Sequence, residues 1–97
     1  MKPVCRIEIV IDALHSEKVV ELLADLGILG YTLIRSVSGS GERGDRRGDD
    51  ITGVSNNHYI LTTCPPEQLE AVTDALRPLL ERVGGVCLTS DARWLQH

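Results

Sequence analysis

Apolar and polar residues alternate over residues 4–11, and this period of two predicts a β-strand with one buried face, because successive side chains point to opposite sides. The apolar positions of one parity are Cys5, Ile7, Ile9 and Ile11. Residues 30–37 and 57–63 are rich in β-branched and aromatic residues and predict two further strands. Residues 86–90 predict a short last strand.

Apolar residues recur at helical spacing in two segments between these strands. The first segment begins at Ser16, which suits the N-cap position, and ends before Gly27, a natural C-terminal stop. The second follows Pro65 and Pro66, which fit a helix start because the first turn leaves its amide donors unpaired, and it ends at residues 84–85. Its apolar stripe consists of Leu69, Val72, Leu76, Leu79, Leu80 and Val83.

The resulting order is strand, helix, strand, loop, strand, helix, strand. This order predicts one α+β domain over residues 1–97, a ferredoxin-like βαββαβ sandwich with both helices on one face of an antiparallel four-stranded sheet. No element remains to cover the other face, so we expect oligomerisation to bury its apolar side chains. We expect these side chains to include some of Val10, Leu33, Ile34, Ile60 and Leu61.

The glycine-rich stretch at residues 38–53 fits neither periodicity. It holds five of the nine glycines and seven charged side chains, with Ile51 as its one aliphatic residue. It therefore buries too little apolar surface to offset the entropy of ordering, and we expect a long mobile loop held at both ends by strands. Loops of this length within a compact domain are usually functional. From composition alone, however, its three arginines are answered by four acidic residues, which is typical of a solvated loop.

Composition excludes several function classes. A net charge of −4 and an aromatic content of 3% argue against nucleic-acid binding, which needs a basic face or stacking platforms. No apolar run reaches the roughly 18–20 residues needed to span a bilayer, and the first residues lack a signal-peptide core. We therefore expect a cytoplasmic protein that does not span a membrane.

The chain shows no sequence motif for catalysis or for metal binding. Cys5, Cys64 and Cys87 are too far apart for a redox or zinc motif, and we interpret them as small buried hydrophobes. The histidines lack ligand spacing, so we expect no metal site within one chain. No Ser or Cys is paired with a base in a recognisable motif. We predict no catalytic residue and no enzyme activity.

Residues 22–33 carry a family resemblance. They read Leu-Leu-Ala-Asp-Leu-Gly-Ile-Leu-Gly-Tyr-Thr-Leu and resemble the first helix and second strand of the PII signalling superfamily, where Leu-Gly-Ile-x-Gly-(aromatic or Met)-Thr-Val precedes a long T-loop. The resemblance implies a ferredoxin-like homotrimer that binds adenine nucleotides between subunits. It places a flexible T-loop at residues 39–55, between the second and third strands.

The chain departs from the nitrogen-regulatory branch of that superfamily. The T-loop lacks the tyrosine that this branch uridylylates, and Ser40, Gly41 and Glu42 stand where a glutamine helps bind magnesium and 2-oxoglutarate. That branch binds the nucleotide phosphates with a Gly-Asp-Gly-Lys loop and a basic C-terminal tail, whereas residues 84–87 follow the second predicted helix here with no lysine. These differences argue against 2-oxoglutarate sensing and favour ADP or AMP over ATP. ATP and cyclic AMP remain open as alternative ligands.

The loop pattern Gly-x-Gly-x-Arg-Gly-x-Arg-Arg instead resembles PII-like proteins associated with bicarbonate transport and carboxysomes. This resemblance implies that Thr32 contacts adenine and that Arg43 and Arg46 bind phosphates through their guanidinium forks. The implied nucleotide-binding residues are Thr32, Ser38, Gly39, Gly41, Arg43, Arg46, Gly85, Val86 and Cys87. The implied bicarbonate-binding residues are Ser40, Arg46 and Arg47.

The resemblance therefore implies a signalling protein that binds an adenine nucleotide, with bicarbonate as a second ligand, and whose T-loop switches to regulate a partner in inorganic carbon metabolism. The expected partner is a bicarbonate transporter or a carboxysome component. Two alternatives remain open. A trimer of the CutA type shares the fold and would bind divalent copper through His and Cys, whereas an ACT-type module would bind a small molecule between subunits without the loop arginines.

Overall fold

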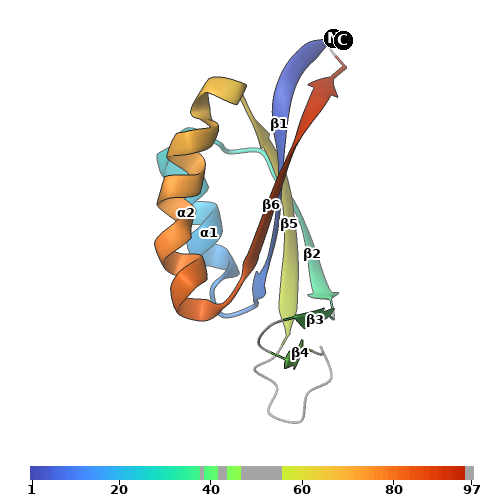
Figure 1. Ribbon diagram of the computed structural model, residues 1–97, viewed down its shortest axis with the longest axis vertical. Helices are drawn as coiled ribbons and strands as arrows, with labels where there is room; N and C mark the ends of the chain where they lie inside the picture. The colour runs from blue at the N-terminus through green and yellow to red at the C-terminus, as the bar shows by residue number, and fades with distance from the viewer. Residues whose placement is uncertain (38, 42–43, 47–55, 96–97) are drawn as a thin grey trace.

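The computed structural model describes residues 1–37, 39–41, 44–46 and 56–95. The four predicted strands and two predicted helices follow one another in the predicted order, and two further short strands lie between the second and third predicted strands (Figure 1). The elements are β1 (Lys2–Asp12), α1 (Ser16–Asp25), β2 (Thr32–Val37), β3 (Gly39–Gly41), β4 (Gly44–Arg46), β5 (Asn57–Cys64), the 3₁₀ turn η1 (Pro66–Gln68), α2 (Leu69–Val83) and β6 (Val86–Trp94).

Within the described residues, four strands form one sheet in the order β2-β5-β1-β6, and every neighbouring pair is antiparallel. Both helices cover the same face of this sheet, and the start of β1 lies beside the end of β6 at the end of the sheet opposite β3 and β4 (Figure 1). This arrangement confirms the ferredoxin-like βαββαβ sandwich. It leaves β2 and β6 as the two edge strands, separated by β5 and β1.

The core lies between the helices and the sheet. The central strand β1 contributes its odd-numbered apolar residues to this face, in register with alternate residues of β5, so that Ile9 lies opposite Ile60. α1 contributes Val19 and Leu23, and α2 contributes Val72 and Leu76. All of these side chains are almost fully buried. Aliphatic residues thus fill the core, as expected for a chain without Phe.

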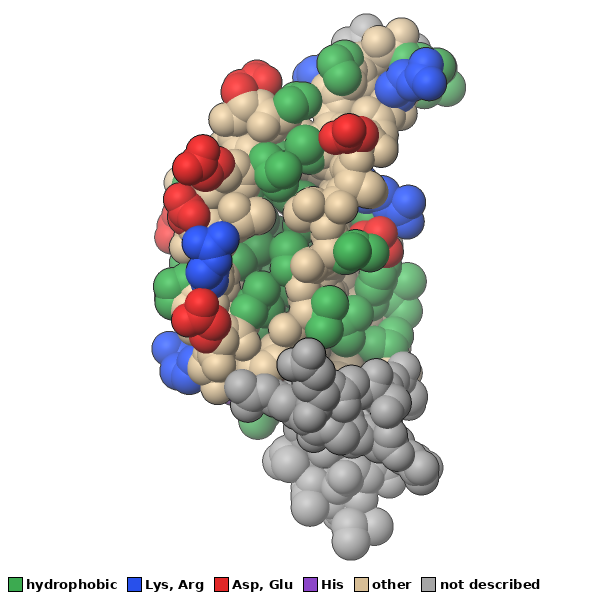
Figure 2. Space-filling model, viewed as in Figure 1, with side chains coloured by type: hydrophobic (Ala, Val, Ile, Leu, Met, Phe, Trp, Pro, Cys, Tyr) green, Lys and Arg blue, Asp and Glu red, His purple; other side chains and the backbone are tan. Residues whose placement is uncertain are grey.

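The second sheet face, hereafter the open face, has no covering element among the described residues. Ile34 and Val86 are 50% and 60% exposed, although both are large and apolar. Figure 2, which views the molecule along the β6 edge of the sheet, shows charged side chains along the helical side and both hydrophobic and charged side chains on the sheet side. Two residues expected as candidates for this face are placed otherwise: Ile60 is in the core, and Leu33 pairs with Ile60 and packs against the core.

The start of α1 differs from the prediction. His15, rather than Ser16, occupies the N-cap position, and no side chain caps the helix there. The Ser16 hydroxyl instead donates to the carbonyl of Ala13 at 3.3 Å and lies 2.8 Å from Nδ1 of His58. Ser16 is buried, and its hydroxyl forms a tertiary hydrogen bond with His58 on β5 instead of capping the helix. The end of α1 is as predicted, because Gly27 adopts a φ of 82°.

β6 extends beyond the predicted strand at residues 86–90. It pairs with β1 along nine residues, from Val86 opposite Val10 to Trp94 opposite Lys2. Polar residues such as Asp91 interrupt the apolar pattern after residue 88, so the sequence does not predict this extension. The backbone hydrogen bonds offered by β1 determine the strand length here, because an antiparallel ladder satisfies donors and acceptors whatever the side chains are.

The glycine-rich stretch contains regular structure that the sequence did not predict. β3 and β4 pair antiparallel, with Gly39 opposite Arg46 and Gly41 opposite Gly44. The sequence analysis expected a loop here and did not predict these two short strands. Residues 38, 42–43 and 47–55 lie outside the described residues, and with them the predicted roles of Ser38, Arg43 and Arg47.

Replacing Gly85 by Ala should lower the free energy of unfolding by about 1–3 kcal/mol, the usual cost of overpacking. An added Cβ would lie 2.8 Å from Cδ2 of Leu80 and 3.0 Å from the carbonyl oxygen of Val10. Gly30→Ala is the matched control, because nothing lies within 4 Å of its added Cβ. Urea unfolding of the two variants measures the difference. Equal stability would show that β6 moves away from α2 without cost.

Candidate ligand-binding cleft

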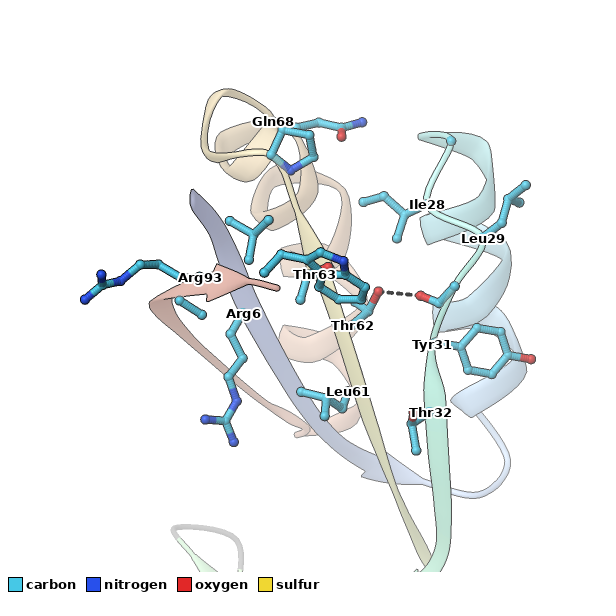
Figure 3. Close-up of a pocket in the computed structure, with 16 residues that line it drawn as sticks. Arg6, Ile28, Leu29, Tyr31, Thr32, Leu61, Thr62, Thr63, Gln68 and Arg93 are labelled. Carbon is cyan, nitrogen blue, oxygen red and sulfur yellow. Dashed lines mark hydrogen bonds between the residues drawn. The ribbon is translucent and has the colours of Figure 1, made fainter. Parts of the chain in front are cut away.

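A cleft of about 730 Å³ opens on the open face, near the end of the sheet where β1 begins and β6 ends. Residues 27–31, which connect α1 to β2, form one side of it, and β1 and β6 form the other side (Figure 3). Alternate residues of β5, such as Leu61 and Thr63, form the floor. This volume lies within the usual range of about 300–1,000 Å³ for small-molecule sites.

Two short hydrogen bonds hold the connecting segment in place. The buried hydroxyl of Thr62 donates to the carbonyl oxygen of Gly30 at 2.6 Å, drawn as a dashed line in Figure 3. The side-chain amide of Gln68 donates to the carbonyl oxygen of Leu26, also at 2.6 Å. Ile28 is buried and packs in the core. This side of the cleft is therefore preformed by contacts within the chain.

The chemistry of the cleft suits an apolar ring that carries an anionic group. Ile28, Leu61 and Trp94 provide apolar surface, and Arg6 and Arg93 are the two charged residues of the described lining, with the Arg93 side chain extending away from the connecting segment (Figure 3). Of the described residues that line the cleft, none is Asp or Glu. In Figure 3, the two arginines extend from the β1 and β6 side. Arginine binds phosphate and carboxylate groups through paired donors, so an anionic ligand is favoured here.

Arg6 belongs to a small polar cluster on the open face. Its Nε lies 3.3 Å from Oε1 of Glu8, and the hydroxyl of Tyr59 donates to the second Glu8 oxygen at 2.7 Å. This hydrogen bond to the Glu8 carboxylate, followed by burial, raises the pKa of Tyr59 above its ordinary value of 10.0. Glu8 thus holds Arg6 on the sheet surface at the margin of the cleft.

The structure separates the predicted nucleotide-binding residues into groups. Thr32 lines the cleft from edge strand β2. Gly85 and Cys87 line a smaller hollow of about 390 Å³ between α2 and the other edge strand, β6, while Val86 is exposed on the open face. The remaining described candidates lie in β3 and β4: Gly39, Ser40, Gly41 and Arg46. Thr32 and residues 85–87 therefore lie at opposite edges of the sheet.

The sequence analysis missed four residues that line the cleft: Arg6, Tyr31, Arg93 and Trp94. Arg6 stood on the polar face of a predicted strand, where an exposed arginine needs no further explanation. Arg93 and Trp94 lay beyond the predicted end of the last strand. The alternation of β6, continued past residue 90, would have placed Trp94 on the open face, but only the register with β1 shows that it does continue.

The described residues contain no group of three or more His, Cys, Asp or Glu side chains able to hold a metal ion. His15 Nδ1 lies 2.7 Å from an Asp12 carboxylate oxygen, and His58 is engaged with Ser16. Within the same part of the chain, no helix is long and apolar enough to cross a membrane.

Residues 4–96 match the family described as nitrogen regulatory protein P-II. The chain belongs to the PII family. This family consists of signalling proteins, so the chain is a PII-like regulatory protein. No curated protein matches the chain.

Solved structures support the assignment to the PII family. CPII from Thiomonas intermedia K12, a PII-like protein solved bound to ADP, AMP and bicarbonate, is 25% identical, with a TM-score of 0.87 over 97% of this chain and 90% of that chain. The same protein bound to ADP and bicarbonate gives 26% identity and a TM-score of 0.85, with coverage of 97% and 90%. A DUF3240 family protein from Shewanella baltica OS155 shares the fold, at 16% identity and a TM-score of 0.70, with coverage of 100% and 96%.

Replacing Thr62 by Val should lower the free energy of unfolding by about 1 kcal/mol, because the carbonyl oxygen of Gly30 loses its donor while the shape of the side chain is kept. Thr73→Val is the matched control, since that hydroxyl donates to Glu70 at an exposed site. Urea denaturation compares the two variants. If Thr62→Val and Thr73→Val lose the same unfolding free energy, the hydrogen bond from Thr62 to Gly30 does not stabilise the connecting segment.

Tyr59 should make the protein lose stability in alkaline solution. Its folded pKa is raised, so its contribution is fully present below pH 10.0 and is lost as the pH rises through the higher folded value. Tyr59→Phe should therefore flatten the fall in unfolding free energy above that pH, while Tyr31→Phe, the control for a lost tyrosine, should keep the wild-type slope. Denaturant unfolding across the alkaline range tests this. An unchanged slope in Tyr59→Phe would contradict it.

Proposed function

We propose that this PII-like protein is a cytoplasmic sensor of adenine nucleotides that binds ADP or AMP, with bicarbonate as a second ligand. The observation that carries the proposal is the cleft on the open face. It combines apolar walls, the hydroxyl of Thr32 and two arginines, Arg6 and Arg93, and no Asp or Glu is among its described lining residues, although Arg6 also pairs with Glu8 beside the cleft. CPII, with a TM-score of 0.87 to this chain, was solved with ADP, AMP and bicarbonate. ATP is less favoured, because no lysine follows α2.

The proposed site is completed by a second copy of the chain. Thr32 lies at the β2 edge and residues 85–87 at the β6 edge, so one chain cannot bring them to the same ligand. In a closed ring, the β2 edge of one subunit meets the β6 edge of the next, and each interface forms one complete site. We propose a homotrimer. Its formation would also cover apolar residues of the open face such as Ile34 and Leu88.

The signalling step is assigned to the T-loop. Ligand phosphates would draw Arg43 and Arg46 towards the site, and the rest of residues 39–55 would follow, changing the surface offered to a partner. Ser40, Arg46 and Arg47 would bind the bicarbonate. The proposed partner is a bicarbonate transporter or a carboxysome component, and the protein itself carries out no catalysis.

Isothermal titration with ADP, AMP, ATP and cyclic AMP, each with and without bicarbonate, tests the proposal. We expect one nucleotide per chain, tighter binding of ADP or AMP than of ATP, and a gain in affinity with bicarbonate. Absence of binding to all four nucleotides would overturn the proposal. Deleting residues 42–50 should abolish binding, whereas an ACT-type site would keep its ligand.

Arg6, one of the two arginines that line the cleft, provides a sharper test. Arg6→Gln should weaken ADP binding about tenfold, because hydrogen bonds to charged groups contribute about 1.5–3 kcal/mol. Arg77→Gln is the matched control: Arg77 is also exposed and also pairs with an acid, Asp74 at 3.2 Å, but it lies on α2 away from the cleft. Equal affinities of the two variants would remove Arg6 from the site.

A further inference from the structure

Cys5 and Cys64 are direct partners in the register of β1 and β5. Both side chains point towards the helices, because they share the parity of the core residues of their strands. Both are buried, with 4% and 2% of their surface exposed. Two thiols thus lie side by side in a core that is otherwise aliphatic at this end of the sheet.

The spacing of such a pair suits a disulfide. Residues directly opposite in an antiparallel ladder have Cα atoms about 4.5–5.5 Å apart, and a disulfide joins Cα atoms about 4.4–6.8 Å apart. The Cβ atoms of opposed residues are about 4.5–5.5 Å apart, whereas a disulfide needs about 3.5–4.5 Å. Closure must therefore draw the two strands together slightly. A disulfide under such strain is easily reduced again.

The sequence neighbours of both cysteines line the cleft. Val4 and Arg6 flank Cys5, Thr63 and Pro65 flank Cys64, and all four lie in the cleft wall. Successive side chains of a strand point to opposite faces of the sheet. The two sulfur atoms therefore lie on its helical side, whereas the cleft lies on the open face. A movement that brings the sulfurs together is transmitted directly to the surface that would hold the ligand.

We propose that Cys5 and Cys64 are a reversible redox pair, oxidised by small-molecule disulfides of the glutathione class, and that the resulting bond changes the affinity of the cleft for its ligand. The second part rests on the proposed function. Cys87, on β6 beside α2, is not part of the pair.

The chemistry balances as two thiol–disulfide exchanges. The Cys64 sulfur attacks the small disulfide after losing its proton, forming a mixed disulfide and releasing one small thiol. The Cys5 sulfur then loses its proton and attacks the Cys64 sulfur, releasing the second small thiol. The protein gives up two electrons and two protons, and the small disulfide is reduced to two thiols.

Cys64 is assigned the first step because, of the two cysteines, it is the one that borders a small hollow of about 160 Å³, shared with Lys2, Val4 and Trp94. Its sulfur lies buried on the helical side, so the attack requires a local opening of this end of the sheet. Burial, and to a smaller extent the neighbouring Cys5, raises the pKa of the Cys64 thiol. The thiolate is the attacking form, so oxidation should be slow at neutral pH and faster as the pH rises.

The test incubates the full chain with oxidised glutathione and then compares its intact mass and its peptide map with those of the reduced protein. We expect the loss of two hydrogens, a Cys5–Cys64 linked peptide and full reversal by dithiothreitol. Cys87→Ala is the matched control and should lose the same two hydrogens, whereas Cys64→Ala should not form the bond. A stable glutathione adduct, a bond to Cys87 or an unchanged mass in both the wild type and Cys87→Ala would overturn the redox pair.

Coupling to the cleft is measured by titrating ADP into the reduced wild-type protein and into the oxidised wild-type protein whose Cys5–Cys64 bond the peptide map has verified. We expect affinities that differ by about fivefold or more. Equal affinities would overturn the coupling while the redox pair stands. A linked peptide in a protein that binds no nucleotide in either form would contradict the proposed function and, with it, the coupling.

Discussion

The antiparallel pairing of β1 with β5 on one side and β6 on the other is the interaction on which the rest of the structure depends. Every layer is positioned from this central strand: its odd-numbered residues form the floor of the core, and its even-numbered residues reach the open face. The ladder also determines where β6 ends, and therefore that Arg93 and Trp94 reach the cleft. A strand buried at the centre of a sheet has no freedom to slip, because a shift of one residue would exchange its two faces.

The cleft shows how a site can be assembled from residues that carry no common motif. The connecting segment that follows α1 is held by Thr62 and Gln68, two residues distant in sequence that donate to its carbonyl oxygens. The arginines come from β1 and β6. Membership of the PII family explains why this segment carries the most specific sequence pattern of the chain. It forms one wall of the cleft, with Thr32 at its end.

The open face links the fold to assembly. Its exposed apolar residues support the proposed assembly, and, under the proposed function, so does the separation of Thr32 from residues 85–87. Ion pairs such as Arg6 with Glu8 within this face would become less hydrated in an assembly. Their geometry, already satisfied within one chain, lowers the cost of covering them.

The sequence by itself determined the element order, the two helical stripes, the end of α1 at Gly27 and the family pattern at residues 22–33, because these depend on local periodicity and on the dihedral freedom of glycine. It missed the length of β6, the pairing of β3 with β4 and the tertiary use of Ser16 in place of a cap. It also missed Arg6, Arg93 and Trp94 as residues that line the same cleft as Thr32. Only the tertiary structure decided these points, since backbone pairing between distant strands decides which residues meet and leaves no periodic trace in the sequence of either strand alone.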